Sequence, residues 1–255
     1  MTAIVKASQM RVGDVLLYRG RSLFSSLIMA FDGGEYSHSA IYNGQEVVEA
    51  VGEGVVHRGI AVSVAGADYV DVFRFRSATN VTLGDPRLPA DPVHDRIKHF
   101  SDNAAQYAYE QILLLALLVT TRRIPVAGII IRPILDHAAD LLNRLMDLGR
   151  EPMICSELVY RCFAEAGPQY LPQIVGAAAM RASAVLDEAV TPATGGDELT
   201  AVQSEAFLRT YLLAKEHYLT EAASGAAGFA PVADFVTPRD LQFCPNLVKI
   251  GRLSV

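Results

Sequence analysis

The chain has 255 residues, of which 51% are hydrophobic and 20% charged, so it can bury a sizeable core and is not disordered over most of its length. Its 22 Lys and Arg residues against 28 Asp and Glu residues give a net charge of −6, and we therefore expect no nucleic acid among its partners. The small, odd number of three cysteines argues against a disulfide framework and favours a reducing compartment.

The start of the chain and its most apolar stretch bear on location. Residues 1–12 contain no apolar run before a small-residue cleavage site, so we expect no signal peptide. The most apolar region, 112–131, is interrupted by polar residues and Pro125, and no uninterrupted run in it approaches the roughly 20 residues that span a bilayer. We predict a cytoplasmic protein without a transmembrane span. Two interpretations of 112–131 stay open, namely buried helices or a surface that contacts lipid in a membrane-associated protein.

Residues 13–76 have the pattern of a β-rich unit with one short helix. Apolar residues at helical spacing predict the helix over 22–31, with an Asp-Gly-Gly sequence to end it. Runs of β-prone residues bounded by turn residues predict the strands, which are 15–18, 37–42, 45–51, 69–76 and, more weakly, 54–60.

Beyond residue 85 the pattern becomes helical. Three prolines between residues 86 and 92 mark a linker, after which 95–148 and 197–223 carry helical patterns without strand signals. Residues 224–231 have the small, flexible composition of a loop, and the tail 247–253 predicts a strand that returns to the sheet. The sequence therefore predicts an α+β fold whose strands come from both ends of the chain.

The most informative segment is the one around Asn43-Gly44, because Asn-Gly between two β-prone runs is a strong hairpin signal. A two-residue type I′ turn on these residues predicts that Tyr42 faces Gln45 and that His38 faces Glu49. Directly opposed side chains share a face, with Cβ atoms about 4.5–5.5 Å apart. A carboxylate there would fix the tautomer of the imidazole and leave its other nitrogen for proton exchange. The alternative is a solvated cross-strand salt bridge of small energetic value.

Cys155 has the most reactive setting of the three cysteines. The segment 151–168 has the pattern of one helix, with Pro152 at its entrance and Gly167-Pro168 as its stop. Cys155 falls at the start of its apolar stripe, where the positive end of the helix dipole favours the thiolate. Cys162 lies deeper on that stripe, where we predict core packing, and a packing role for Cys155 is the alternative to a reactive one. Together with the histidine–carboxylate pair, the helix-start cysteine predicts a Cys–His–Glu site.

The sequence resembles the permuted papain-fold enzymes of the NlpC superfamily, of the YiiX/YaeF type. The matching motifs are the Gly-Asp strand opening 13–18, the Ser-His strand 37–42, the Glu-Ala strand 47–50, the Cys-Ser-Glu-Leu-Val helix start 155–159 and the Thr-Pro-x-Asp-Leu segment 237–241. His38 precedes Cys155, whereas the cysteine comes first in unpermuted papain-like proteins. The resemblance implies a circularly permuted papain-like fold, in which an antiparallel sheet or half-barrel packs on the nucleophile helix and carries helical insertions.

The resemblance also implies roles and a domain organisation. Cys155 would be the nucleophile, His38 the general base and then acid, and Glu49 the residue that orients His38, with a thioester acyl-enzyme as intermediate. The backbone N–H of Cys155 would donate to the oxyanion, and Tyr18 and Ser156 are further candidates for substrate or oxyanion contacts. The chain would be a single domain over 1–255, with a strand-rich core at 11–80, a helical insert at about 92–150 and the nucleophile helix and C-terminal part at 151–255.

We therefore expect a thiol-dependent hydrolase, amidase- or peptidase-like, that needs no cofactor. Its substrate would be an amide- or ester-containing small molecule, a peptide or a lipid, and a lipid acyltransferase or thiol esterase on the same fold is the alternative. A peripheral contact of 112–131 with lipid would suit that alternative. Two other interpretations stay open, namely a non-catalytic binding module and a zinc site. Zinc could bind His38, Glu49 and Cys155, or the window of His94, Asp95 and His99, although no established metal-binding spacing supports it.

Overall fold

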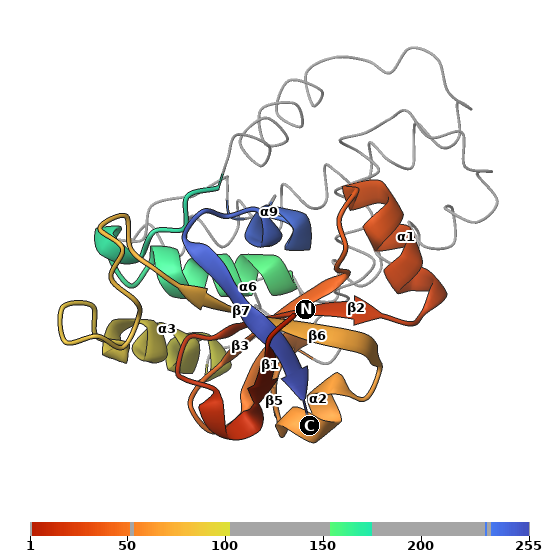
Figure 1. Cartoon of the computed structure of the whole chain (residues 1–255), viewed down its shortest axis with the longest axis horizontal. Helices are drawn as coiled ribbons and strands as arrows, with labels where there is room; N and C mark the ends of the chain where they lie inside the picture. Colours follow the sequence, from red (N-terminus) through yellow and green to blue (C-terminus); the bar gives the residue numbers. More distant parts are fainter. Residues whose placement is uncertain (1, 52–53, 103–153, 175–232, 234–235, 255) are drawn as a thin grey trace, which may run out of the picture.

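A seven-stranded sheet forms the centre of the computed structural model, which describes residues 2–51, 54–102, 154–174, 233 and 236–254 (Figure 1). Its strands are β1 (Ile4–Lys6), β2 (Val15–Gly20), β3 (His38–Tyr42), β4 (Val47–Val51), β5 (Gly54–Arg58), β6 (Ala67–Phe75) and β7 (Leu247–Ser254). The described α-helices are α1 (Leu23–Asp32), α2 (Ile60–Val64), α3 (Asp91–Asp102), α6 (Cys155–Ala164) and α9 (Pro238–Gln242), and the 3-10 helices are η1 (Ala7–Gln9) and η2 (Pro168–Tyr170). The fold is therefore mixed α+β, as the sequence predicts.

The two ends of the chain meet in the sheet, whose order is β1-β7-β6-β2-β3-β4-β5. β7 pairs antiparallel with β6 and parallel with β1, which confirms the returning C-terminal strand. All other neighbours are antiparallel. The sequence did not predict β1, because a strand of three residues is too short to show a period.

Alternating residues of β2 belong to two separate hydrophobic clusters, one on each face of the sheet. Val15 and Leu17 pack in the larger cluster, to which α3, α6 and α9 contribute. Leu16 and Tyr18 pack in the smaller one, which α2 and β1 complete. The helices α6 and α9 lie on one side of the sheet and α2 on the other (Figure 1). Phe75 of β6 stacks on Phe163 of α6 with ring centroids 5.0 Å apart, so α6 is fixed to the sheet by its buried face.

The predicted helix and strands near the N-terminus are present. Ser22 caps α1 by accepting the N–H of Ser25 at 2.9 Å, and Gly33 ends the helix in the left-handed conformation. The helix α2 begins where the weak strand prediction over 54–60 ends, and the sequence did not predict it. Most of the helical prediction over 95–148, the helix at 197–223, the loop at 224–231 and the apolar region 112–131 lie outside the described residues. Among the described residues, no helix is long and apolar enough to cross a membrane.

The β3–β4 hairpin corrects the predicted register. Tyr42 pairs with Val47, so the turn is centred on Gly44 and Gln45 rather than on Asn43 and Gly44. Gly44 has a φ of 103°, whereas Asn43 is not among the residues with positive φ. The Asn43 side chain instead accepts the N–H groups of Gln45 and Glu46 at 2.8 and 2.7 Å, an Asx-type turn that competes with type I′. The register shift is even, so every side chain keeps its face, and His38 and Glu49 become diagonal neighbours instead of direct ones.

The Gly13-Asp14 opening of β2 has a local structural role. Gly13 has a φ of 80°, and a Cβ there would lie 2.3 Å from the Leu83 side chain, so glycine is required. Asp14 is buried and accepts two hydrogen bonds from Arg74, both at 2.7 Å, and one from the Arg11 N–H at 2.8 Å. This motif therefore ties the start of β2 to β6. Glu49 of the predicted site lies on β4, two strands away from β2 in the sheet.

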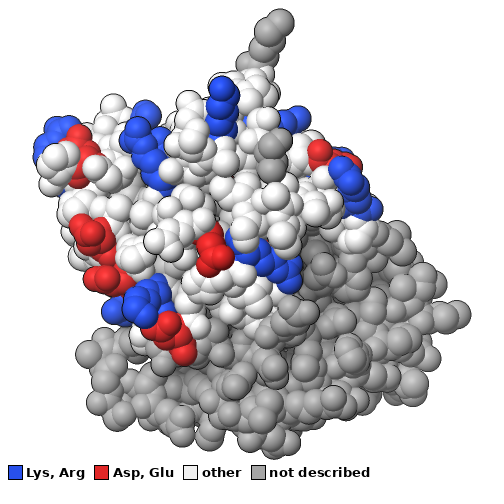
Figure 2. Space-filling view, turned by 90° about the horizontal axis from the view of Figure 1, so that it is seen from below, with Lys and Arg blue, Asp and Glu red and all other residues white. Residues whose placement is uncertain are grey.

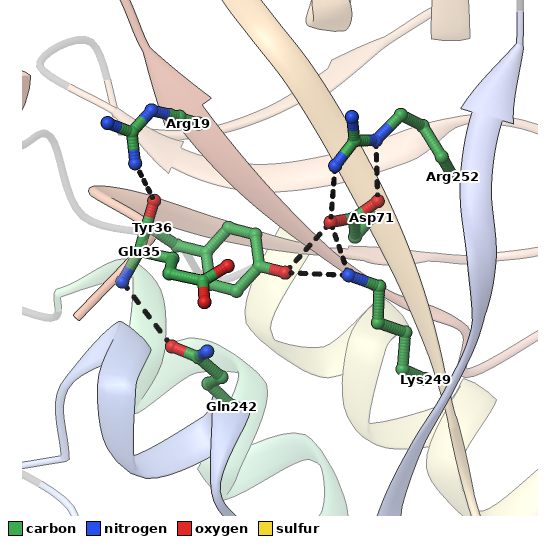
Figure 3. Close-up of polar contacts among 7 residues, drawn as sticks. All are labelled: Arg19, Glu35, Tyr36, Asp71, Gln242, Lys249 and Arg252. Carbon is green, nitrogen blue, oxygen red and sulfur yellow. Dashed lines mark hydrogen bonds and ion pairs between the residues drawn. The ribbon is translucent and has the colours of Figure 1, made fainter. Parts of the chain in front are cut away.

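A buried carboxylate, Asp71 of β6, ties the C-terminal strand into the sheet (Figure 3). Arg252 donates to Asp71 from Nε at 3.0 Å and from Nη2 at 3.2 Å, and Lys249 donates from Nζ at 2.7 Å. The hydroxyl of Tyr36 adds a third donor at 2.9 Å. Burial alone would raise the pKa of Asp71, but these donors outweigh it and lower the pKa below the ordinary value.

Removing both cations should destabilise the fold markedly. The double substitution Lys249→Met with Arg252→Met leaves Asp71 buried without its counter-ions, and we expect a loss of about 3 kcal/mol in urea unfolding at neutral pH. Adding Asp71→Asn to this double variant should recover much of the loss, because no buried charge then remains. A double variant as stable as the native chain would contradict this account. The contribution of Asp71 is present above its ordinary pKa of 3.8 and is lost as the pH falls through its lowered value.

Candidate active site

Cys155 lies at the first position of α6. Ile154 before it is extended, with φ −88° and ψ 161°, and Glu157 accepts the Ile154 N–H at 3.2 Å, which satisfies one of the helix's first donors. The helix ends at Ala164, before Gly167 with its φ of 132°. It is shorter than the predicted segment 151–168, and residues 151–153, with Pro152, lie outside the described part of the chain.

The C-terminal motif holds the start of this helix in place. The Ser156 hydroxyl donates to the Val236 carbonyl at 2.6 Å. Thr237 then caps α9 by accepting the Asp240 N–H at 3.2 Å, and the Asp240 side chain accepts the Thr237 N–H at 2.9 Å. The predicted site residue Ser156 is fully buried, and its hydroxyl serves this packing contact.

His38 and Glu49 lie in contact, as the sequence predicts, although they are not the directly opposed pair that the predicted turn would give. Nε2 of His38 lies 2.8 Å from Oε2 of Glu49, and the two side chains are 17% and 3% exposed. The pair is therefore largely buried, and the alternative of a solvated surface salt bridge does not describe it. Nη1 of Arg58, from β5, lies 3.5 Å from the other oxygen of Glu49, so the buried carboxylate has a cation on each side.

Cys155 completes this group at the point where β3 begins. Its sulfur accepts the backbone N–H of Ser39 at 3.3 Å and the Ser39 hydroxyl at 3.0 Å. Burial lowers the pKa of His38, but the charge of Cys155, a hydrogen bond with it and the bond to Glu49 outweigh burial and raise the pKa to about 10. The structure thus brings the three predicted residues together, with His38 between Cys155 and Glu49.

Tyr18, the other predicted contact residue, packs against His38. It pairs with His38 across β2 and β3, and the two rings lie 5.1 Å apart at 56°. Its hydroxyl lies 2.6 Å from the Ser63 hydroxyl of α2, and burial raises the pKa of Tyr18, so the phenol stays protonated. In this structure Tyr18 supports the imidazole ring, and its hydroxyl is held by Ser63.

Sequence reasoning missed three residues of the site, namely Ser39, Arg58 and Ser63. Ser39 follows His38 directly. The only sequence signal for Ser39 was strand alternation, which places its side chain on the opposite face of the sheet from His38, where an amphipathic helix could cover it. Arg58 could have been found by extending the hairpin to β5, where Val56 pairs with Glu49. Ser63 gave no signal, since it belongs to the helix that the sequence did not predict.

The titration of His38 gives a direct check of these contacts. His38 should remain an imidazolium up to about pH 10, and Cys155→Ala should bring its deprotonation to lower pH, because Cys155 gives the strongest contributions that raise the pKa. The NMR chemical shifts of the ring nitrogens, assigned with a His38→Gln variant, measure the pH at which His38 loses its proton. Deprotonation near the ordinary 6.5 in the native chain would contradict the geometry. By linkage, the stabilisation from protonated His38 is complete below pH 6.5 and is lost as the pH rises through about 10.

The other cysteines lie in the core. Cys162 is fully buried, as predicted, and burial raises its pKa. Cys244 is also buried, with its sulfur 3.8 Å from the Asn246 side-chain oxygen, and burial raises its pKa as well. Neither setting favours a thiolate.

Two further observations concern ligands. Within the described ranges, no three His, Cys, Asp or Glu side chains are grouped so that they could hold a metal ion. On the face shown in Figure 2, the described Lys, Arg, Asp and Glu side chains lie scattered among uncharged residues, and both signs of charge are present.

No family model matches the chain, and no curated protein matches it either.

Proposed function

We propose that this chain is a thiol-dependent hydrolase that uses Cys155, His38 and Glu49 on a circularly permuted papain-like fold. The observation that carries the proposal is the position of His38, which contacts Cys155 at a helix start and Glu49 at 2.8 Å. A nucleophile, a base beside it and a third group that orients the base are the signature of covalent acyl transfer. The order of the chain, with the histidine strand before the cysteine helix, agrees with the permuted arrangement.

The chemistry begins with acylation. The Cys155 sulfur attacks the carbonyl carbon of an amide or ester, and a C–S bond forms while the carbonyl oxygen takes the negative charge. The backbone N–H of Cys155, in the first turn of α6, is not required within the helix and can donate to this oxyanion. Glu49 holds Nε2 of His38, so Nδ1 gives its proton to the leaving amine or alcohol as the C–N or C–O bond breaks.

Deacylation reverses the proton flow. His38 takes a proton from water through Nδ1, the resulting hydroxide attacks the thioester carbon, and the C–S bond breaks to return the thiolate. The carboxylate of Glu49 stabilises the imidazolium in both half-reactions, and Arg58 offsets the remaining charge of Glu49. An alcohol or amine in place of water would make the same site an acyltransferase. The substrate that we propose is an amide- or ester-containing small molecule, peptide or lipid.

Alkylation with iodoacetamide, followed by peptide mapping, separates this proposal from a non-catalytic binding module. We expect Cys155 to react at neutral pH faster than Cys162 and Cys244, which serve as internal controls because the pKa values of both are raised. His38→Gln should remove the preference for Cys155, because the thiolate loses its imidazolium. Equal slow labelling of all three cysteines in the native chain would count against the enzyme.

A further inference from the structure

Ser39 presents two hydrogen-bond donors to the sulfur of Cys155. Its backbone N–H lies 3.3 Å from Sγ and its hydroxyl oxygen 3.0 Å from Sγ, and both residues are fully buried. Water therefore does not compete for either bond. The same short stretch of β3 holds the acid–base residue, His38, and the residue that touches the nucleophile.

The strand pairing explains why a backbone N–H is available there. The β3–β4 pairing extends only over Ile41 and Tyr42 on the β3 side, so it ends before Ser39. In an antiparallel ladder successive N–H groups point to opposite edges of the strand. The N–H of Ser39 points to the edge of β3 that faces β4. Because the β3–β4 pairing has already ended there, this N–H donates to Cys155 at the start of α6 instead.

Two donors aimed at one sulfur favour one protonation state of that sulfur. A neutral thiol is a weak acceptor, whereas hydrogen bonds to a charged acceptor are roughly twice as strong as neutral ones. We infer that Ser39 is a positioning residue that stabilises and aims the Cys155 thiolate, an inference that rests on the proposed function. Its hydroxyl acts through Cys155 and keeps its own proton throughout the reaction.

The contact also affects the two half-reactions differently. When Sγ forms the C–S bond, the sulfur loses its charge and both Ser39 bonds weaken. They recover when the thioester breaks and the thiolate returns. Ser39 therefore favours the thiolate over the thioester, which makes the sulfur a better leaving group in deacylation.

The test is the ultraviolet absorbance of the thiolate, taken as the difference between a chain that has Cys155 and the same chain with Cys155→Ala, at one neutral pH. For Ser39→Ala we expect the thiolate-to-thiol ratio to fall about tenfold, which corresponds to one lost charge-assisted hydrogen bond. Ser39→Thr retains the hydroxyl and should keep a ratio close to the native one. A merely structural serine would not give this pattern.

Ser37→Ala is the matched control, because Ser37 is also buried and its hydroxyl bonds to the backbone of Gly20 and Tyr18. It should leave the thiolate absorbance unchanged. An unchanged ratio in Ser39→Ala, a Thr variant that behaves like the Ala variant, or an equal fall in Ser37→Ala would overturn the inference. If Ser39→Ala does not fold, Ser39→Val takes its place, because valine has nearly the shape of threonine without the hydroxyl. A thiolate ratio in Ser39→Val equal to that in Ser39→Thr then overturns the inference. Failure of the proposed function would show separately, as turnover that survives Cys155→Ala.

Discussion

Replacing Cys155 by alanine is expected to lower thiol-dependent turnover at least about 10⁴-fold, because loss of a covalent nucleophile removes the whole acyl-enzyme route. Cys155 is fully buried at the start of α6, so Cys155→Ala removes only one sulfur from a packed position and should leave the fold intact. Steady-state hydrolysis of matched nitrophenyl esters and nitroanilides, with acyl chains of different length, measures the loss and compares ester with amide substrates.

The control for this substitution is Cys162→Ala, two turns further along the same buried stripe. Cys162→Ala also removes one sulfur atom from this helix, so the stability of the Cys162→Ala variant should fall at least as much as that of Cys155→Ala. Its turnover should stay within about twofold of the native rate. If both variants kept the native rate, a thiol mechanism would be excluded. If both lost activity equally, the effect would come from the fold rather than from the nucleophile.

The second large effect is expected from His38→Gln, which removes the group that transfers protons in both half-reactions. General acid–base catalysis contributes about 10²–10⁴-fold, and loss of the imidazolium also destabilises the thiolate, so we expect the upper end of this range. The change should appear in kcat, with KM nearly unchanged, because His38 acts on the reacting atoms. Single-turnover acylation measured by release of nitrophenolate or nitroaniline gives the rate of the first half-reaction alone.

Two comparisons make the His38 prediction specific. Glu49→Gln retains a side chain of the same shape but not its charge, so its loss should be smaller than that of His38→Gln. The double variant with Cys155→Ala should be no slower than Cys155→Ala alone, since residues that act as one unit are not additive. Additive losses in the double variant would show that His38 and Cys155 act in separate processes.

Much of the sheet was predictable because its signals are local. β2, β3 and β4 are short apolar runs between turn residues, and α1 begins at a serine cap and ends at a glycine. The turn register was not predictable from Asn-Gly alone, because the Asn43 side chain can accept backbone N–H groups itself. β1 and α2 are too short to show a period, and they are held by tertiary contacts with β7 and β6.

The candidate site was predictable in its members more than in its geometry. An even register shift cannot change the face of a side chain. The contact between His38 and Glu49 was therefore predicted correctly although the predicted position of the turn was wrong. Cys155 was identified from the helix stripe, but its contact with Ser39 depends on where the β3–β4 ladder ends, which no local pattern records. The role of Ser156 in binding Val236 depends likewise on a contact between segments about 80 residues apart.

Trapping the acyl-enzyme and measuring its intact mass distinguishes covalent catalysis by Cys155 from any other route. After rapid acid quench of the native chain with a nitrophenyl ester, intact-mass spectrometry should show one added acyl group, mapped to Cys155 and released by hydroxylamine as expected for a thioester. The adduct should be absent in Cys155→Ala and should accumulate more slowly in His38→Gln. Turnover of the ester with no adduct on Cys155, or with the acyl group on another residue, would contradict the account.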